Sequence, residues 1–457
     1  MRNETTTTQA GIDVGQVLDT NRFAGLPVAV ALFTTLTLVF DGFDIQAIAF
    51  AAPSLLTEWG IDRPTLAPVL AAALLGMALG GLVFGAMGDY IGRRRALIGS
   101  LALVAIGSWI CTYASSPGEL AVYRLLTGIG LGGTLPNAAA LIAEFAPLAV
   151  RNLVVTVTVV GIPIGGMLGA TVAAALIPAF GWRAIFVVGA ALPAALTLAM
   201  LLWLPESPRF LVAKRERWPQ LARLLNRLKG ASLYGGEGPF HIREQQNPSG
   251  RAGIAALFTR EFRYDTAVVW VIFLTNVFAV YAIFNWLPTV LSAAGLPLAT
   301  AIRGSFAFNL GGVAGALAGA VLMNRFGSRR VLICFALAAV ASTFAAASLP
   351  LESTTGVPLL LAVMALSGAC IIALQVGMYS VAAYIYPTSC RASGLGWALG
   401  MARFGGILSS FAGSVLLGFG GGAASFFTGI AAVLLLTLGG IVLLKRDMPP
   451  TRLPERQ

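Results

Sequence analysis

The sequence predicts an all-α, polytopic membrane protein with twelve transmembrane helices arranged in two six-helix halves. Its composition is the first indication, because 57% of its 457 residues are hydrophobic, only 11% are charged and the mean hydropathy is +0.84. A soluble globular domain carries about twice that share of charged residues. The second and third indications are a series of long apolar windows and an internal repeat.

A helix needs about 20 apolar residues to cross a bilayer. Twelve such windows are found, at residues 26–52, 65–87, 96–114, 119–142, 152–178, 183–204, 266–290, 302–323, 330–348, 357–382, 393–418 and 423–444. They predict an N-terminal half at 26–204 and a C-terminal half at 266–444, flanked by cytoplasmic termini at 1–25 and 445–457.

The polar segments complete this organisation. The N-terminus is Thr-rich and contains acids, so it lacks the form of a cleaved signal peptide and the first span is expected to direct insertion. The cytoplasmic central loop at 205–265 predicts one or two short amphipathic helices around 214–229 and a flexible remainder. A plain linker and a regulatory segment both remain possible interpretations of this loop.

Cationic residues fix the orientation. With both termini cytoplasmic, most of the 30 lysines and arginines lie on the cytoplasmic side, against three expected outside at Arg63, Arg183 and Arg303. This is the distribution that the positive-inside rule describes. The net charge of +11 therefore reports topology and does not indicate a nucleic-acid partner.

Two short motifs recur in the second half of the chain. Residues 88–95 (GDYIGRRR) return as 323–330 (MNRFGSRR), and 144–151 (EFAPLAVR) returns as 384–391 (YIYPTSCR), at offsets of 235 and 240 residues. Pro53 and Pro288, which we expect to end the first and seventh spans, match at 235. Such repeats predict two parallel halves with a substrate site between them near the bilayer midplane.

Asp41 and Asp44 lie in the first apolar span, three residues apart, and therefore on the same side of a helix. A charged Asp at mid-bilayer depth costs about 2.5–3.5 kcal/mol on insertion scales, so both are expected to face protein or a water-filled path. A purely structural ion pair is the alternative, although one pair needs only one Asp.

Arg403 lies in the eleventh span, and no acid lies in the C-terminal spans to pair with it. Because the guanidinium group suits bidentate binding of a carboxylate, we expect Arg403 to bind a substrate carboxylate or to share Asp41 with it. Aromatic side chains at Tyr281, Phe284, Trp286 and Phe308 are candidate walls for a ring, with Asn137, Asn309, Gln375 and Tyr379 as polar partners. Each aromatic alone also fits simple packing.

Small residues at four-residue spacing, Gly128 and Gly132 in one span and Gly161, Gly165 and Gly169 in the next, predict close approach of helices. The run at 128–133 lies inside an apolar span, so it is not a dinucleotide-binding loop. No P-loop, zinc motif or nucleophile elbow is seen, and no cofactor, metal or enzymatic activity is predicted. The four scattered cysteines are interpreted as small core residues.

The motifs resemble those of the major facilitator superfamily over almost the whole chain. They are Gly88-Asp89 with Gly92-Arg93-Arg94, Arg124 followed by Gly128, Gly130 and Gly132, and Pro205-Glu206-Ser207-Pro208-Arg209. Within it, three stretches resemble the aromatic acid:proton symporter family: Asp41-Gly42-Phe43-Asp44, the run from Gly132 to Asn137, and Tyr386-Pro387-Thr388 with Arg391. Two departures are Asn324, where an acid is usual, and Tyr384, where sugar porters carry a glutamate.

The resemblance implies a bacterial inner-membrane symporter that imports a benzoate-type or hydroxybenzoate-type carboxylate with protons, without a cofactor. It also implies an Asp44–Arg124 pair that takes part in proton coupling, with Asp41 as a second carrier or a substrate ligand. For Arg124, a structural ion pair or a snorkelling position near a helix end is the alternative. A monomer is the simplest expectation.

The cytoplasmic residues Asp89, Arg93, Arg94, Glu144 and Arg151, with Arg391 in the second half, predict a charge network that closes the inner face in the outward-open state. Simple positive-inside anchoring is the alternative. Two further functions also stay open: an exchanger or exporter of organic anions, and a membrane sensor that binds aromatic acids without transporting them.

Overall fold

The computed structural model describes residues 11–230, 233–235, 238–242, 254–349, 356–387, 390–418 and 420–449. Parts of both predicted cytoplasmic termini, part of the central loop and Thr388 lie outside the described residues. Twelve helices within this range are long and apolar enough to cross a membrane. They confirm the predicted fold class.

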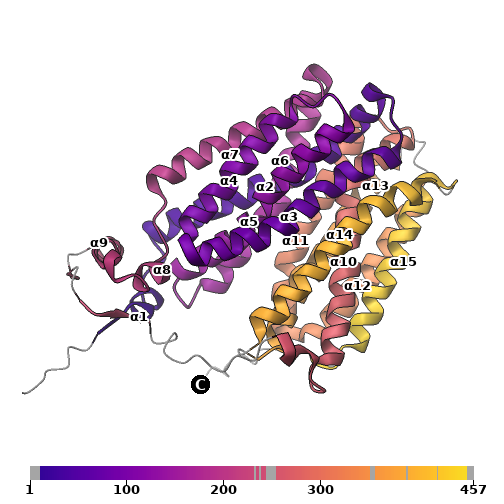
Figure 1. Ribbon diagram of the computed structural model, residues 1–457. Coiled ribbons are helices and arrows are strands. Elements are labelled where there is room, and N and C mark those ends of the chain that lie inside the picture. Colours follow the sequence, from indigo (N-terminus) through magenta and orange to yellow (C-terminus); the bar gives the residue numbers. More distant parts are fainter. Residues whose placement is uncertain are drawn as a thin grey trace, which may run out of the picture.

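The N-terminal half contains α2 (Leu26–Trp59), α3 (Arg63–Ile91), α4 (Arg93–Cys111), α5 (Pro117–Phe145), α6 (Arg151–Phe180) and α7 (Arg183–Trp203). The C-terminal half contains α10 (Arg263–Ala293), α11 (Leu298–Phe326), α12 (Ser328–Ala347), α13 (Val357–Ile385), α14 (Arg391–Gly418) and α15 (Gly422–Leu443). In Figure 1 the two sets of helices form two bundles side by side.

The prediction that Pro53 and Pro288 end their spans is wrong. Pro53 lies inside α2, which continues to Trp59, and Pro288 lies inside α10. Prolines are tolerated in membrane helices because neighbouring groups satisfy the backbone carbonyl that proline leaves free. Beyond Pro53 the helix continues regularly, and the Thr57 hydroxyl donates to the Pro53 carbonyl one turn back at 3.1 Å. The helix instead ends at Gly60, whose φ of 61° suits a glycine.

Glycines bring helix backbones into direct contact, and the contacts repeat between the halves. A Cβ atom at Gly80 of α3 would overlap the carbonyl oxygen of Ile129 in α5. A Cβ atom at Gly315 of α11 would overlap the carbonyl oxygen of Ala369 in α13. These two contacts are related by the offsets of 235 and 240 residues that the sequence motifs show.

The same relation holds between other helices. Gly165 of α6 lies against the carbonyl oxygen of Val39 in α2, and Gly405 of α14 lies against that of Leu274 in α10. Equivalent glycines therefore set the spacing of equivalent helices in both halves. The repeat inferred from short loop motifs extends into the packing of the spans.

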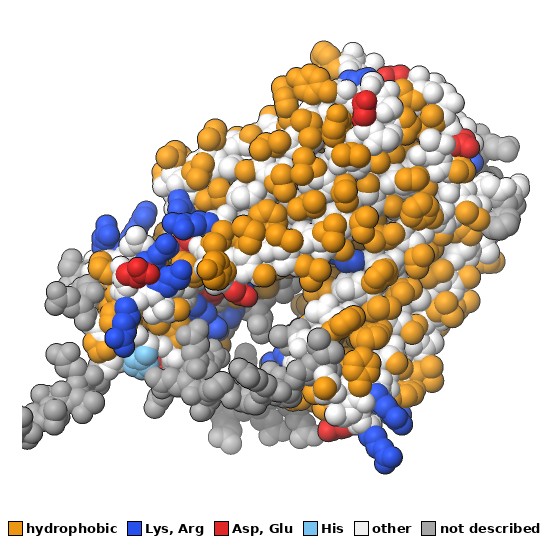
Figure 2. Space-filling view, viewed as in Figure 1, with side chains coloured by type: hydrophobic (Ala, Val, Ile, Leu, Met, Phe, Trp, Pro, Cys, Tyr) orange, Lys and Arg blue, Asp and Glu red, His pale blue; other side chains and the backbone are white. Residues whose placement is uncertain are grey.

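The chain before α2 and part of the central loop form a small cap on one end of the N-terminal half. Its helices are α1 (Val14–Asp19), α8 (Pro208–Val212) and α9 (Trp218–Lys229), joined by a parallel pair of two-residue strands, β1 (Ile12–Asp13) and β2 (Phe240–His241). Helix α9 agrees with the predicted amphipathic segment around 214–229, whereas α8 and the strand pair were not predicted. Figure 2 shows Lys and Arg gathered on this cap and hydrophobic side chains along the bundle.

The four cysteines are free thiols. Cys111, Cys370 and Cys390 are buried, as expected for small core residues, but Cys334 in α12 is exposed. Its exposure corrects the expectation of a core position for this residue.

The glycine contacts predict a matched pair of effects on stability. Gly80→Ala should lower the free energy of unfolding by about 1–3 kcal/mol, because the added methyl group forces two helix backbones apart. Gly85→Ala, in the same helix, should be neutral or slightly stabilising, because nothing lies within 4 Å of its Cβ position and alanine favours a helix. Thermal unfolding of both purified variants in detergent measures this, and equal midpoints would contradict the proposed close packing.

Candidate functional site

A cavity of about 100 Å³ lies between the two halves. Asp41 of α2, Met77 of α3 and Pro163 of α6 line it from the N-terminal half. The opposite wall comes from α10, α11, α13 and α14 of the C-terminal half. A cavity of ~150 Å³ in another protein holds one benzene ring, so this volume is on the scale of a single ring.

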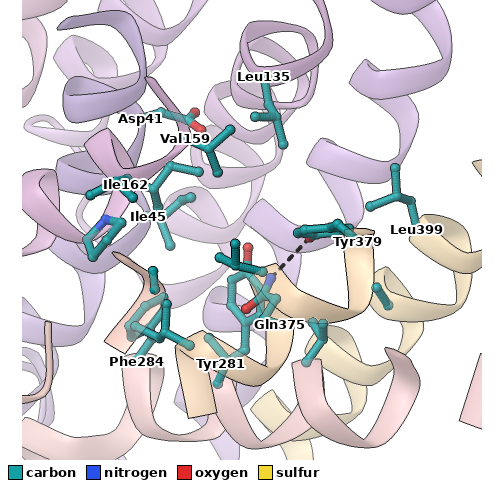
Figure 3. A pocket seen from close by; sticks show the side chains of 18 of the residues that line it. Asp41, Ile45, Leu135, Val159, Ile162, Tyr281, Phe284, Gln375, Tyr379 and Leu399 are labelled. Atoms are coloured by element: carbon teal, nitrogen blue, oxygen red, sulfur yellow. Dashed lines mark hydrogen bonds between the residues drawn. The ribbon is translucent and has the colours of Figure 1, made fainter. Parts of the chain in front are cut away.

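Asp41 contributes a carboxylate to the cavity. The Thr134 hydroxyl of α5 donates to its Oδ1 at 3.0 Å, and the side chain is 2% exposed. Figure 3 shows Asp41 near Val159 and Leu135, on the opposite side of the cavity from Tyr281 and Gln375. One anionic group therefore faces an otherwise largely apolar N-terminal wall.

Arg403 contributes the cationic group. Its Nη1 lies 3.4 Å from the hydroxyl oxygen of Tyr281 and 3.6 Å from the sulfur of Met77, to both of which it donates. No carboxylate lies within ion-pair distance of Arg403 in the described part of the chain. Weak, neutral partners leave the guanidinium group able to bind an anion that enters the cavity.

Aromatic rings contribute to the C-terminal wall beside aliphatic side chains. Tyr281 and Phe284 pack edge to face with ring centroids 5.9 Å apart, and Phe284 packs in the same way on buried Phe308. The Gln375 amide donates to the Tyr379 hydroxyl at 3.2 Å, as the dashed line in Figure 3 marks. The wall thus combines ring surfaces with two groups that can exchange hydrogen bonds with a polar ring substituent.

Asp44 and Arg124 form a second, separate charged site inside the N-terminal half. Arg124 Nη1 donates to Asp44 Oδ2 at 2.7 Å, and Nη2 donates to the Asp44 backbone carbonyl at 3.0 Å. The Ser108 hydroxyl donates to Asp44 Oδ1 at 2.6 Å. Arg124 is 0% exposed, which excludes the snorkelling position considered from the sequence.

The two aspartates face the same helix, as their spacing predicts, because Thr134 and Arg124 both belong to α5. Their surroundings differ, however. Asp44 is fully paired away from the cavity, whereas Asp41 lies on the cavity surface.

Four predicted substrate residues, Asn137, Trp286, Phe308 and Asn309, do not line the cavity. Asn137 donates from α5 to the Phe84 carbonyl at 3.0 Å, in the packing of α3 on α5. Trp286 is buried and donates to the Ser410 carbonyl at 3.1 Å. In each case a backbone carbonyl inside one half accepts from the side-chain N–H group, although Oδ1 of Asn137 has no partner among the described residues.

Asn309 instead joins the two halves. It exchanges two hydrogen bonds with Gln46 of α2, at 3.1 and 2.9 Å. Residues 41–52 of α2 and 275–291 of α10 are all buried, in the part of each helix that lies farther from the cap. The halves are therefore packed together at the end of the bundle opposite the cap.

The predicted cytoplasmic set makes contacts within one half or between the N-terminal half and the segments that flank it. Arg93 pairs with Asp89, Arg151 with Asp19, and Glu144 accepts from Ser207. The Arg94 side chain donates to the Leu201 carbonyl at 2.6 Å, and Arg391 donates to the Tyr386 carbonyl at 3.2 Å. None of these contacts, all between described residues, joins the two halves.

Arg151 and Arg391 nevertheless repeat each other. Arg151 Nε donates to the Ala146 carbonyl at 3.2 Å, five residues back, as Arg391 does to Tyr386. Both arginines fix the turn that enters the following helix.

Sequence reasoning missed several residues of these sites. Thr134 holds Asp41, Ser108 holds Asp44, and Gln46 joins the halves. Thr134 lies in the stretch from Gly132 to Asn137 that resembles the symporter family, and Gln46 lies two residues after Asp44. Both positions could therefore have been singled out from the sequence. A single serine in an apolar span gives no such signal.

Comparisons with known proteins agree with this architecture. The sequence profile of the Major Facilitator Superfamily matches residues 34–319 and 304–457. The 4-hydroxybenzoate transporter PcaK of Pseudomonas putida is 33% identical over 440 residues, covering 95% of this chain and 97% of that protein. The gallate transporter of the same organism is 35% identical over 421 residues, covering 92% of each.

A solved structure of the xylose transporter XylE from E. coli has a similar fold. It superposes with a TM-score of 0.72 and 17% sequence identity, covering 93% of this chain and 99% of that one.

The buried pair makes a prediction about stability. Arg124→Gln should lower the free energy of unfolding by about 3–5 kcal/mol, because it leaves the Asp44 carboxylate buried without a counter-charge. Adding Asp44→Asn should recover part of this loss. Arg183→Gln, which breaks the exposed pair with Glu58, should cost at most about 1 kcal/mol. Thermal unfolding of Arg124→Gln, Asp44→Asn, the double variant and the Arg183→Gln control measures the coupling, and simply additive losses would show that the pair does not act as a unit.

Proposed function

This chain belongs to the major facilitator superfamily, and we propose that it imports an aromatic carboxylate of the benzoate or hydroxybenzoate class together with a proton, by alternating access, across a bacterial inner membrane. The observation that carries the proposal is the pairing, in one ring-sized cavity between the halves, of Arg403 with aromatic walls. The relatives named above transport 4-hydroxybenzoate and gallate, both hydroxylated aromatic acids. The superfamily consists of transporters, so no enzymatic reaction is proposed.

In this proposal the substrate carboxylate binds Arg403. A planar guanidinium group forms two parallel hydrogen bonds to a carboxylate, which fixes the orientation of the ring as well as its charge. The ring then packs against Tyr281 and Phe284, and Gln375 and Tyr379 meet its polar substituents. Arg403 belongs to the C-terminal half and Asp41 to the N-terminal half, so the occupied site joins both halves.

Asp41 is the proposed proton carrier. In the empty site the ionised Asp41 balances the charge of Arg403. When the substrate carboxylate takes that role, a proton on Asp41 keeps the net charge of the site unchanged. The empty and the loaded site are therefore both neutral. Because moving a net charge through a low-dielectric interior is costly, these two neutral states are the ones that can change from exposure on one side of the membrane to exposure on the other. A site that holds the substrate without the proton, or the proton without the substrate, carries a net charge and is disfavoured. This is the basis of coupling.

The packing of the halves opposite the cap supports an arrangement in which this structure is open toward the cap, which we expect to be cytoplasmic. In the reverse state, the residues Asp89, Arg93, Arg94, Glu144, Arg151 and Arg391 are the proposed contacts that close the cytoplasmic side. The Gln46–Asn309 pair is the proposed contact that has to open.

The proton-coupling assignment is tested in liposomes with an inward proton gradient and a labelled hydroxybenzoate. Asp41→Asn should abolish accumulation but retain exchange of external for internal substrate, because the neutral side chain permits the loaded state only. Arg183→Gln is the control and should accumulate like the wild type. If Asp44→Asn gives exchange without accumulation and Asp41→Asn does not, the proton is carried by the Asp44–Arg124 pair.

Arg403→Ala and Arg403→Lys should both abolish uptake, because the bidentate partner of the carboxylate is lost, while membrane insertion stays normal. Binding assays with the purified wild type should show competition by benzoates but not by benzamide or phenol, which lack the carboxylate. Normal uptake by either variant would refute the role of Arg403. Saturable binding without flux in the wild type would instead favour a sensor, and gradient-driven export would favour an exporter.

Phe284→Ala should raise KM for uptake up to about tenfold, which corresponds to the 0.5–1.5 kcal/mol typical of a ring contact. Phe344→Ala, at an exposed ring far from the cavity lining, is the matched control. Uptake kinetics in the same liposomes provide the measurement. An equal change in both variants would place the ring-binding surface elsewhere.

A further inference from the structure

A second hollow lies on the outer surface of the C-terminal half. It is a groove of about 510 Å³ formed by α11, α12 and α13, with apolar walls from Leu322, Phe326, Val331, Phe335 and Leu366. Phe326 is 47% and Leu366 52% exposed, so the groove opens toward the bilayer and not toward the transport cavity. We refer to it as the α11–α13 groove.

One end of the α11–α13 groove carries positive charge. Arg330 lines the groove and has no hydrogen bond or ion pair within the part of the chain that is described. Arg325 lies over the Phe326 ring at 5.3 Å, and Arg329 donates to the Val442 carbonyl at 2.7 Å. All three arginines lie where α11 ends and α12 begins, on the side that we expect to be cytoplasmic.

This combination matches an amphiphile with an anionic head. An apolar trough within the membrane accepts a hydrocarbon chain, and an unpaired arginine at its cytoplasmic end accepts a phosphate. Basic pockets between transmembrane helices on the cytoplasmic side are typical sites for anionic headgroups, and each cation near the surface contributes about 1 kcal/mol. Exposed arginine alone would not select a ligand; the adjoining trough makes the site specific.

The internal repeat shows how the groove differs from the equivalent region of the N-terminal half. The residue equivalent to Cys334, which lines the groove, is Gly99, and the Phe84 ring of α3 lies 3.6 Å from its Cβ position. At Gly319, the equivalent of Phe84, the nearby ring comes instead from Phe335 of α12, 3.5 Å from the Gly319 Cβ position. The two halves thus place this ring on different helices, while Arg95 repeats Arg330.

We propose that the α11–α13 groove is a binding site for an anionic phospholipid, with the phosphate on Arg330 and one acyl chain along Leu322, Phe335 and Leu366. The proposal is independent of the substrate and of proton coupling. A lipid held there would join the ends of α11 and α12 to the inner leaflet and fill a gap that the chain leaves open.

The first test measures lipid binding by native mass spectrometry of the full-length protein in detergent, with phosphatidylglycerol and phosphatidylcholine of equal chain length. The wild type should retain phosphatidylglycerol about fivefold more strongly, the ratio that corresponds to one arginine beside a headgroup of net negative charge, because phosphatidylcholine carries the same phosphate but is zwitterionic. Arg330→Gln should remove this preference. Arg95→Gln, at the equivalent position of the other half, should retain it.

The second test uses the groove itself. Ala338→Phe, which fills the trough, should reduce binding of both lipids, and phosphatidylglycerol should protect Cys334 from a maleimide because Cys334 is the exposed cysteine in the groove. Equal binding of both lipids by the wild type, or an equal effect of the two arginine variants, would overturn the proposal. Crosslinking of Cys334 between two copies of the chain would overturn it as well, because the groove would then be a dimer contact.

Discussion

The ion pair between Arg124 and Asp44 is the constraint on which the arrangement of charge in this protein depends. Both side chains are almost completely buried, and a buried guanidinium group without a counter-charge would be strongly destabilising. Arg124 therefore pairs with one of the two aspartates of α2. The Ser108 hydroxyl and the Asp44 carbonyl complete the pair, although Nε of Arg124 has no partner among the described residues.

Because Asp44 is paired with Arg124, Asp41 is the aspartate of α2 whose carboxyl group lies at the cavity between the halves. It lies one helical turn away, on the same side of α2, and is held by Thr134. Across the cavity, the partners of Arg403 among the described residues are the neutral side chains of Met77 and Tyr281. A carboxylate and a guanidinium group that face one cavity from different halves form a site whose charge balance depends on its contents, which is the property that a coupled carrier needs.

The two halves share a backbone plan but differ in side chains. Equivalent glycines, such as Gly80 and Gly315, set equivalent helix contacts. At the equivalents of Asp41 and Asp44 the C-terminal half has Asn276 and Ala279, and at the equivalent of Arg403 the N-terminal half has Pro163. The common plan supports two bundles that move as similar rigid bodies. The differences place the aspartates at 41 and 44 in the N-terminal half and the arginine at 403 in the C-terminal half.

The twelve spans, the division into halves and the residue types of the site could be predicted from the sequence, which also predicts an orientation of the spans. These follow from one-dimensional properties: the length of apolar windows, the position of cations and the spacing of repeated motifs. Asp41 and Arg403, both named as candidates from the sequence, line one cavity in the structure. Only the tertiary structure decided that Trp286 and Asn137 lie outside that cavity, that Asn309 joins the halves through Gln46, and that α2 and α10 continue through their prolines. The physical reason is that membrane helices are apolar on nearly all sides, so their sequence pattern says little about which face meets the cavity. Rotation and crossing of the helices are set instead by local contacts, such as the glycines against carbonyl oxygens, which exist only once the helices are packed.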